Sequence, residues 1–537
     1  MTRFCGALPL HSSSRTHQAI TVTLLLFCGL CPDSNGAEIV DHPFLGVTHI
    51  TRTETSPRSV TMHIVRIDLT IPGISFRLTP PGGTRETVRQ TTLSYLNAQQ
   101  AQVAVNGHFF LPFPSADPNA MLIGLGASDG NVYSAFEAPV QSYALVTDAP
   151  AINIDSFNHA SVAHKNVAFP DGKHVLEPVI LWNTVAGSAQ IVTNGIKTIP
   201  LYIDATHPDG LLTPPGPANY SNSNSWYDLI NARTAIGLSR DDQTLFLFTV
   251  DRAGGSLGLS VGEVADLLIK DYGVYNALNL DGGGSTTLTM ENPVTHARTI
   301  VNLSSDNPAG RTVASSLAVF ASADTIAPST TVEVLPAPNV NGWNHSDVTL
   351  SLTGTDNPGG AVRELHYEFI GAHAEPPGVV SGNLLSRSIG EEGTTTVTYF
   401  GKDYVGNEEH SQSSIVAIDK TGPVISGMPD GNCVLWPANG AWRHVGTVFA
   451  VDTLSGVARD SLRVTVGSNE PLDPESADVM ISPDGSGRVD VLLRARRLGK
   501  GSGRTYSLTA EVQDLAGNTS AVTAACVVPH DQGKNKK

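Results

Sequence analysis

The chain is poor in cysteine, in charged residues and in long apolar runs. Of its 537 residues, five are cysteine, 15% are charged and 6% are aromatic. Acidic residues outnumber basic ones by 50 to 33, giving a formal net charge of −17. This shortage of positive charge argues against nucleic acid and anionic membranes as partners, because both need basic patches.

The N-terminus has the pattern of a secretory signal. Arg3 and Arg15 precede a mostly apolar run, Ala19–Leu30, that is short beside the roughly 20 residues of a membrane-spanning helix. Small residues at Asn35-Gly36-Ala37 then offer a cleavage point. We expect residues 1–37 to be a signal peptide and the protein to be secreted, periplasmic or on the cell surface. An uncleaved anchor is the alternative, and no later segment is apolar enough to span a membrane.

The cysteines divide into two groups. Cys5, Cys28 and Cys31 leave with the predicted signal, so only Cys433 and Cys526 remain. In an oxidising compartment these two predict one disulfide bond, and two buried free thiols are the alternative.

Length alone predicts about three domains, because single cores rarely grow beyond about 250–300 residues. An α+β unit is expected first, then a linker at Ala323–Ser329. All-β immunoglobulin-like sandwiches of ~90–110 residues are expected after it. The predicted boundaries are residues 38–324, 328–420 and 421–529, followed by a disordered tail at 530–537.

The two C-terminal segments share a motif. Each closes with Asp-x-x-Gly-Asn, at Asp403–Asn407 and Asp514–Asn518. Gly and Asn tolerate positive φ and Asp can accept hydrogen bonds from the following backbone, so the motif predicts a tight turn. Such turns could hold calcium, but no other feature of the sequence supports an ion. The histidines show no H-E-x-x-H spacing, and we expect neither a metal nor a cofactor.

Within the first unit, one helix is marked clearly. Ser260 and Glu263 form a capping box, apolar residues from Val261 to Leu268 share one face, and Gly273 ends the helix. Strands are expected at Val60–Leu69, Gln102–Val105, Tyr143–Thr147, Thr244–Val250 and Tyr275–Leu280.

The most informative stretch follows the last of these strands. Asp281 is followed by Gly282, Gly283, Gly284, Ser285 and Thr286. Glycines let the backbone approach a ligand, and successive N–H groups can form an anion-binding nest. A plain tight turn is the alternative. The segment lacks the lysine of a Walker loop and does not fit the dinucleotide fingerprint.

A second aspartate, Asp251, ends the strand Thr244–Val250. If the two strands run in the same direction, as a strand–helix–strand unit favours, Asp251 and Asp281 lie at the same sheet edge. Paired carboxylates are the usual groups of glycosidic cleavage, which makes both residues candidates for catalysis. Asp251 could instead only cap its strand.

Two further motifs supply polar groups. Asn106, Gly107 and His108 follow the strand at 102–105, and Arg233 and Thr234 precede the strand at 244–250. An arginine fork can bind a phosphate with two hydrogen bonds. A structural histidine and a surface ion pair are the alternatives for His108 and Arg233.

Together these motifs resemble the phosphodiester glycosidases over roughly residues 90–320. The matching segments are Asn106-Gly107, Phe109-Phe110, Arg233 to Gly237, Val250-Asp251, Asn279 to Thr286, Val301-Asn302 and Arg311 with Ala314. The resemblance implies hydrolysis between a sugar's anomeric carbon and a phosphodiester oxygen. By matching positions it places Asn106, Arg233, Asp251, Asp281, the glycines 282–284, Asn302 and Arg311 in the pocket.

The chain departs from the family pattern in three places. His108 and Arg252 stand where the family commonly has glycine, and residues 201–224 resemble an insertion. We expect a carbohydrate or glycan phosphodiester as the substrate, and these departures leave the identity of its sugar open. The sequence does not give the oligomeric state. Two other functions remain: a glycosidase acting on phosphate-free extracellular polysaccharide, and a glycan-binding or adhesin protein without catalysis.

Overall fold

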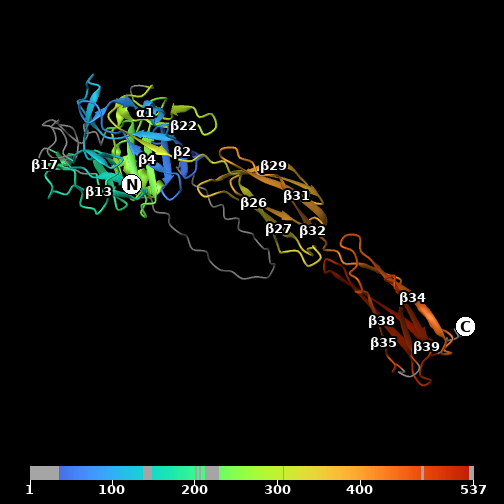
Figure 1. Ribbon diagram of the computed structural model, residues 1–537. Coiled ribbons are helices and arrows are strands. Elements are labelled where there is room, and N and C mark those ends of the chain that lie inside the picture. Colours follow the sequence, from blue (N-terminus) through green and yellow to red (C-terminus); the bar gives the residue numbers. More distant parts are fainter. Residues whose placement is uncertain are drawn as a thin grey trace, which may run out of the picture.

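The computed structural model describes residues 36–136, 148–199, 202–204, 207–211, 229–305, 308–472 and 477–530. The predicted signal peptide, the strand at 143–147, most of the insertion at 201–224 and nearly all of the C-terminal tail lie outside these ranges. The described chain forms three units in a row, with the largest at the N-terminal end (Figure 1). Within the described residues, no helix is long and apolar enough to cross a membrane.

An eight-stranded sheet forms the centre of the first unit. Its order is β1 (Ala37–Phe44), β2 (Val47–Glu54), β3 (Val60–Asp68), β20 (Thr244–Val250), β19 (Arg233–Leu238), β21 (Asn276–Asn279), β15 (Ala189–Thr193) and β16 (Ile196–Lys197). A five-stranded sheet contains β23 (Arg298–Ile300), β22 (Leu288–Glu291), β7 (Val103–Asn106), β25 (Ser316–Phe320) and β4 (Ser75–Leu78). A third sheet contains β11 (Asn131–Ser134), β10 (Gly126–Ser128), β14 (Asn183–Ala186), β12 (Ala151–Ile154) and β13 (Ala160–Ala163).

Short strands and helices complete this unit. The short strands are β5 (Thr87–Val88), β6 (Gln90–Thr91), β8 (Phe110–Leu111), β9 (Asn119–Leu122), β17 (Tyr202–Asp204), β18 (His207–Leu211) and β24 (Thr312–Val313). The α-helices in the described residues are α1 (Thr92–Gln99) and α2 (Val261–Tyr272). The sequence predicts an α+β unit, and the structure gives a mostly β unit with few helices.

Helix α2 confirms the local sequence signals. Ser260 and Glu263 form both hydrogen bonds of the capping box, and Gly273 ends the helix with a φ of 66°. The helix packs Val264 and Leu268 against one face of the central sheet, beside Phe248 of β20. These contacts fix the helix over the strands that lead to the two candidate carboxylates.

The opposite face of the central sheet is also buried. There Leu245 and Leu247 of β20 pack in one core with Val105 of β7 and Leu317 of β25. Because side chains alternate along a strand, the apolar run at 244–250 supplies two cores at once. The central sheet thus lies between helix α2 and the five-stranded sheet.

Two all-β units follow. The first pairs the sheet of β26 (Ser329–Leu335), β27 (Val348–Thr355) and β30 (Leu384–Ile389) with that of β29 (Glu375–Ser381), β28 (Val362–Gly371), β31 (Gly393–Asp403) and β32 (Gln412–Ile418). The second pairs β33 (Val424–Ser426), β34 (Trp442–Val451), β37 (Val489–Arg494) and β36 (Val479–Pro483) with β35 (Arg463–Ser468), β38 (Gly503–Gln513) and β39 (Thr519–Pro529). Each unit encloses its own apolar core.

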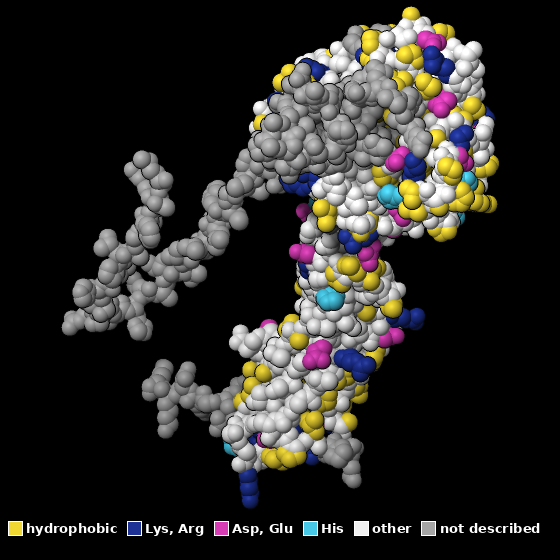
Figure 2. Space-filling view, turned by 90° about the vertical axis from the view of Figure 1, so that its left-hand side faces the viewer, with side chains coloured by type: hydrophobic (Ala, Val, Ile, Leu, Met, Phe, Trp, Pro, Cys, Tyr) yellow, Lys and Arg dark blue, Asp and Glu magenta, His cyan; other side chains and the backbone are white. Residues whose placement is uncertain are grey.

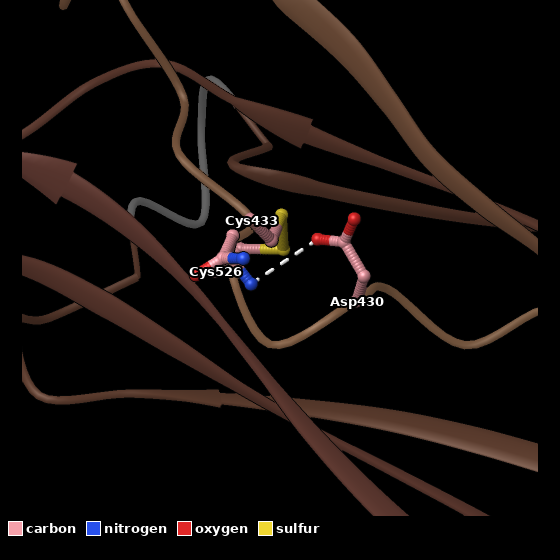
Figure 3. Close-up of a disulfide and its surroundings, with 4 residues drawn as sticks. Asp430, Cys433 and Cys526 are labelled. Carbon is pink, nitrogen blue, oxygen red and sulfur yellow. Dashed lines mark hydrogen bonds between the residues drawn. A yellow bond between two sulfur atoms is a disulfide. The ribbon is translucent and has the colours of Figure 1, made fainter.

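The predicted disulfide is present in the last unit. Cys433 and Cys526 are bonded, with their Cα atoms 4.6 Å apart. Cys433 N–H also donates to the Asp430 carbonyl, which holds the loop before the bridge (Figure 3). The bond joins this loop to β39 and is buried at the edge of the core.

Candidate active site

The candidate site lies at one end of the central sheet, where β20 and β21 both terminate. Each of these strands pairs antiparallel with β19, which lies between them, so β20 and β21 run in the same direction. Asp251 and Asp281 therefore follow strands that end at the same sheet edge, as the sequence predicts. Arg233, the first residue of β19, pairs with Val250 at this edge.

Asn106 joins this edge to the neighbouring sheet. Its Oδ1 accepts hydrogen bonds from Thr234 Oγ1 at 2.9 Å and from Thr287 N at 3.0 Å. Its Nδ2 donates to the carbonyl oxygen of Asp281 at 2.7 Å, and the side chain is fully buried. Asp281 N–H donates in turn to the Gly107 carbonyl at 3.1 Å. Both backbone groups of Asp281 are thus fixed by the end of β7.

The glycine run is a short 3₁₀ turn, Gly283–Ser285. The N–H groups of Gly283, Ser285 and Thr286 donate to the carbonyls of Ala232, Gly282 and Gly283. These three donors are engaged within the protein, so they are not free to bind an anion. The glycines serve the turn itself, because Gly283 has a φ of 59° and a Cβ on Gly282 would lie 3.0 Å from the Ala232 carbonyl.

The hydroxyl groups of Ser285 and Thr286 differ in their hydrogen bonding. Ser285 Oγ accepts a hydrogen bond from Arg311 Nη1 at 3.3 Å. The guanidinium of Arg311 also lies 4.9 Å from the centre of the Phe113 ring. Thr286 Oγ1 is buried and has no hydrogen-bond partner in the protein, and the same holds for Oδ1 of Asn279. Two unpartnered polar atoms therefore flank Asp281 along the chain, where a bound ligand could satisfy them.

Three residues predicted to contact the substrate, Asn106, Asn302 and Arg233, form hydrogen bonds within the protein. Asn302 accepts a hydrogen bond from Leu288 N and donates to the Thr286 carbonyl, so it holds the chain after the turn. Arg233 donates to the carbonyls of Leu229 and Leu259, and only 2% of its surface is exposed. Like Asn106, these residues hold segments of the site together, and their contact with a substrate stays a prediction.

His108 is also a structural residue. It is fully buried, its Nδ1 lies 2.9 Å from Ser315 Oγ, and its Nε2 lies 2.9 Å from the Leu125 carbonyl oxygen. Burial lowers the pKa of His108 to about 4, so the ring is neutral near pH 7. The structural alternative for this histidine therefore fits the geometry.

Comparison with known proteins shows which family this part of the chain matches. Residues 99–320 match the family model described as phosphodiester glycosidase. This part of the chain is a phosphodiester glycosidase domain. It contains Asn106, Arg233, Asp251, Asp281, Asn302 and Arg311, the residues gathered at the sheet edge.

Individual relatives match over short stretches. N-acetylglucosamine-1-phosphodiester alpha-N-acetylglucosaminidase from Homo sapiens is 46% identical over 63 residues, and that from Bos taurus is 43% identical over 67 residues. Each match covers 12% of this chain and 12% of the relative. The zebrafish catalytic domain of that name, auto-inhibited by its pro-peptide, is 19% identical and covers 53% of this chain and 88% of its own, with a TM-score of 0.35.

Beside Asp251, the first unit also contains a histidine pair that the sequence does not suggest. His63 Nε2 lies 3.8 Å from Asp251 Oδ2, and His63 Nδ1 lies 3.2 Å from His49 Nε2. Asp251 Oδ1 accepts a hydrogen bond from Leu303 N. Burial, and to a smaller extent His63, lowers the pKa of His49 to about 4. The one available signal is that His63 stands between the apolar residues Met62 and Ile64 of strand β3.

Proposed function

We propose that the phosphodiester glycosidase domain hydrolyses a sugar-1-phosphodiester. Water adds at the anomeric carbon, the bond to the phosphodiester oxygen breaks, and the products are a free sugar and a phosphomonoester. One observation carries the proposal: Asp281 is held through both of its backbone groups, beside a turn whose Ser285 hydroxyl is bonded to Arg311. A fixed carboxylate and an arginine are what cleavage next to a phosphate needs.

Each side chain of the site has a separate role in the proposed reaction. Asp281 acts on the anomeric carbon or on the leaving oxygen, and Arg311 stabilises the negative charge that grows on the phosphate. Thr286 Oγ1 supplies a further hydrogen-bonding group that the protein itself leaves unpartnered. Asp251, next to His63, is the second carboxylate of the pair. Acidic and basic side chains are interspersed on the described part of the face seen in Figure 2.

We further propose that the protein is exported and that its sugar is of the N-acetylglucosamine type, with the C-terminal units as immunoglobulin-like modules. The export follows from the predicted signal at residues 1–37, and the sugar from the names of the relatives that match. The chemistry proposed at Asp281 needs none of these three features.

A substrate panel tests the reaction class. The mature protein is incubated with sugar-1-phosphodiesters and with aryl glycosides that lack phosphate, and sugar release is measured. We expect release from the phosphodiesters. Release from the phosphate-free substrates alone would favour the polysaccharide glycosidase, and binding without release would favour the glycan-binding protein.

The variant Asp281→Asn tests the assigned residue. We expect sugar release to fall by on the order of 10²–10⁴-fold, because the charge is lost while the shape is kept. The matched control is Asp266→Asn on helix α2, whose carboxylate is exposed and pairs with Lys197. Turnover near that of the wild type in a folded Asp281→Asn protein would refute the assignment.

A further inference from the structure

Two groups of three aspartates lie at the two junctions between the units. Asp324, Asp356 and Asp403 each offer an oxygen to one cluster, and these oxygens lie within 4.8 Å of one another. Asp419, Asp452 and Asp514 form the second cluster in the same way.

The two clusters are built from equivalent positions. One aspartate comes from the linker between units, one follows β27 or β34, and one opens the Asp-x-x-Gly-Asn turn. In both turns the asparagine reaches back to the linker: Asn407 Nδ2 donates to the Asp324 carbonyl at 3.2 Å, and Asn518 Nδ2 to the Asp419 carbonyl at 2.8 Å. The repeat motif of the sequence thus brings each linker to its cluster.

The first cluster leaves polar atoms without partners. Oδ2 of Asp356 is buried and has no hydrogen-bond partner, and the same is true of Oδ1 of the adjacent Asn357. A Cβ on Gly360 would lie 2.7 Å from Asp324 Oδ2 and 2.9 Å from Asp356 Cγ, so these two carboxylates face the same small space. Buried oxygens of this kind normally accept a hydrogen bond, so the lack of a partner here points to a bound ligand.

No positive side chain balances these charges. Within the described ranges, none of the six aspartates forms an ion pair with Lys, Arg or His. Asp403 Oδ1 accepts hydrogen bonds from three backbone N–H groups, which orient the carboxylate but leave its charge. Three carboxylates held this close repel one another unless a cation lies between them.

We propose that Asp324, Asp356 and Asp403 bind a divalent cation of the calcium type, and that Asp419, Asp452 and Asp514 bind a second one. The donor set consists of carboxylate and amide oxygens without sulfur or imidazole, which suits calcium rather than zinc. The sequence does not reveal these clusters, because the three aspartates of each are far apart in the chain and meet only in the fold.

The position of the first cluster gives the cation a mechanical role. Gly46 N of the first unit donates to the Gly359 carbonyl at 3.0 Å, and the His42 ring lies 4.6 Å from the Tyr404 ring. These contacts join the catalytic unit to the loops that carry Asp356 and Asp403. A bound ion fixes the linker to the same loops, so it sets the angle between the two units.

Calorimetric titration with calcium tests the site. The mature full-length chain is freed of metal with a chelator and titrated with CaCl₂. We expect two ions per chain, with dissociation constants on the order of 10⁻⁴–10⁻³ M or tighter. Asp356→Asn is expected to bind one ion. The control Glu333→Gln, an exposed carboxylate on β26 outside both clusters, should still bind two. Absence of binding up to millimolar calcium, or two ions in Asp356→Asn, would overturn the proposal.

Terbium luminescence gives a second measurement that does not depend on a cluster variant folding. Terbium replaces calcium at oxygen sites and emits when a nearby tyrosine is excited, and Tyr404 follows Asp403 directly. We expect tyrosine-sensitised emission that calcium displaces and that Tyr404→Phe reduces. Emission that calcium does not displace would contradict a calcium site at this junction.

Discussion

The change Asn106→Ala separates two roles for this residue. In the structure its carboxamide bonds the Thr234 hydroxyl, the Thr287 N–H and the Asp281 carbonyl, all of them buried. Alanine leaves these three groups without partners, at about 1–3 kcal/mol each before relaxation. Allowing for some relaxation, we expect the free energy of unfolding to fall by about 3–5 kcal/mol. Sugar release should fall as well, because Asp281 loses its support.

Asn153 provides a matched control. Its carboxamide accepts from Trp182 N and Thr184 Oγ1 and donates to the Ile180 carbonyl, the same three kinds of partner, but in the third sheet. Asn153→Ala should destabilise by a similar amount while the remaining folded molecules keep their turnover.

Denaturant unfolding and sugar release, both measured on the two variants, distinguish a positioning role of Asn106 from direct contact with the sugar. If Asn106 only contacts sugar hydroxyls, Asn106→Ala keeps the stability of the wild type and loses affinity for substrate. That outcome would refute the positioning role derived from the hydrogen bonds.

Two further predictions concern stability. The unfolded chain protonates His108 near pH 6.5 but the folded chain only near pH 4, so this residue costs about 3 kcal/mol of stability as pH falls through that range and nothing above it. His108→Gln should therefore flatten the acid side of the stability curve, in which His49 also contributes; a curve of unchanged slope would argue against a buried neutral ring. The disulfide closes a loop with a sequence separation of 93, so replacing both Cys433 and Cys526 by alanine should lower the stability of the last unit by about 4–5 kcal/mol. Unfolding followed through Trp436 and Trp442 measures this, and a loss below about 1 kcal/mol would show that the unfolded loop is already restricted.

The features that the sequence predicts correctly depend on signals that lie close together in the chain or, for the disulfide, on there being only two candidate cysteines. Helix α2 is confirmed with its capping box and its C-terminal glycine, because all of its signals lie within fourteen residues. The disulfide is confirmed, and it could be predicted because only two cysteines lie outside the predicted signal. Strand β20 has the predicted bounds, since an apolar run of seven residues fits a strand buried on both faces.

The roles of the site residues could not be predicted in the same way. Asn106 meets Asp281 from 175 positions away, and nothing in the local motif shows that its amide bonds backbone groups rather than sugar. The glycine run permits either a nest or a closed turn, and only the position of the Ala232 carbonyl decides between them. The contact of His63 with Asp251 could not be predicted, because the two residues lie far apart in the chain.

Strand β20 packs leucines on one side and phenylalanines on the other, which makes its register unusually costly to change. A slip by one residue would turn Leu247 toward helix α2 and Phe248 toward β25, and neither core could accept the exchange of shapes. The same slip would move Asp251 by about 3.4 Å along the sheet and onto its other face. The position of Asp251 at the candidate active-site edge thus depends on hydrocarbon packing well behind it.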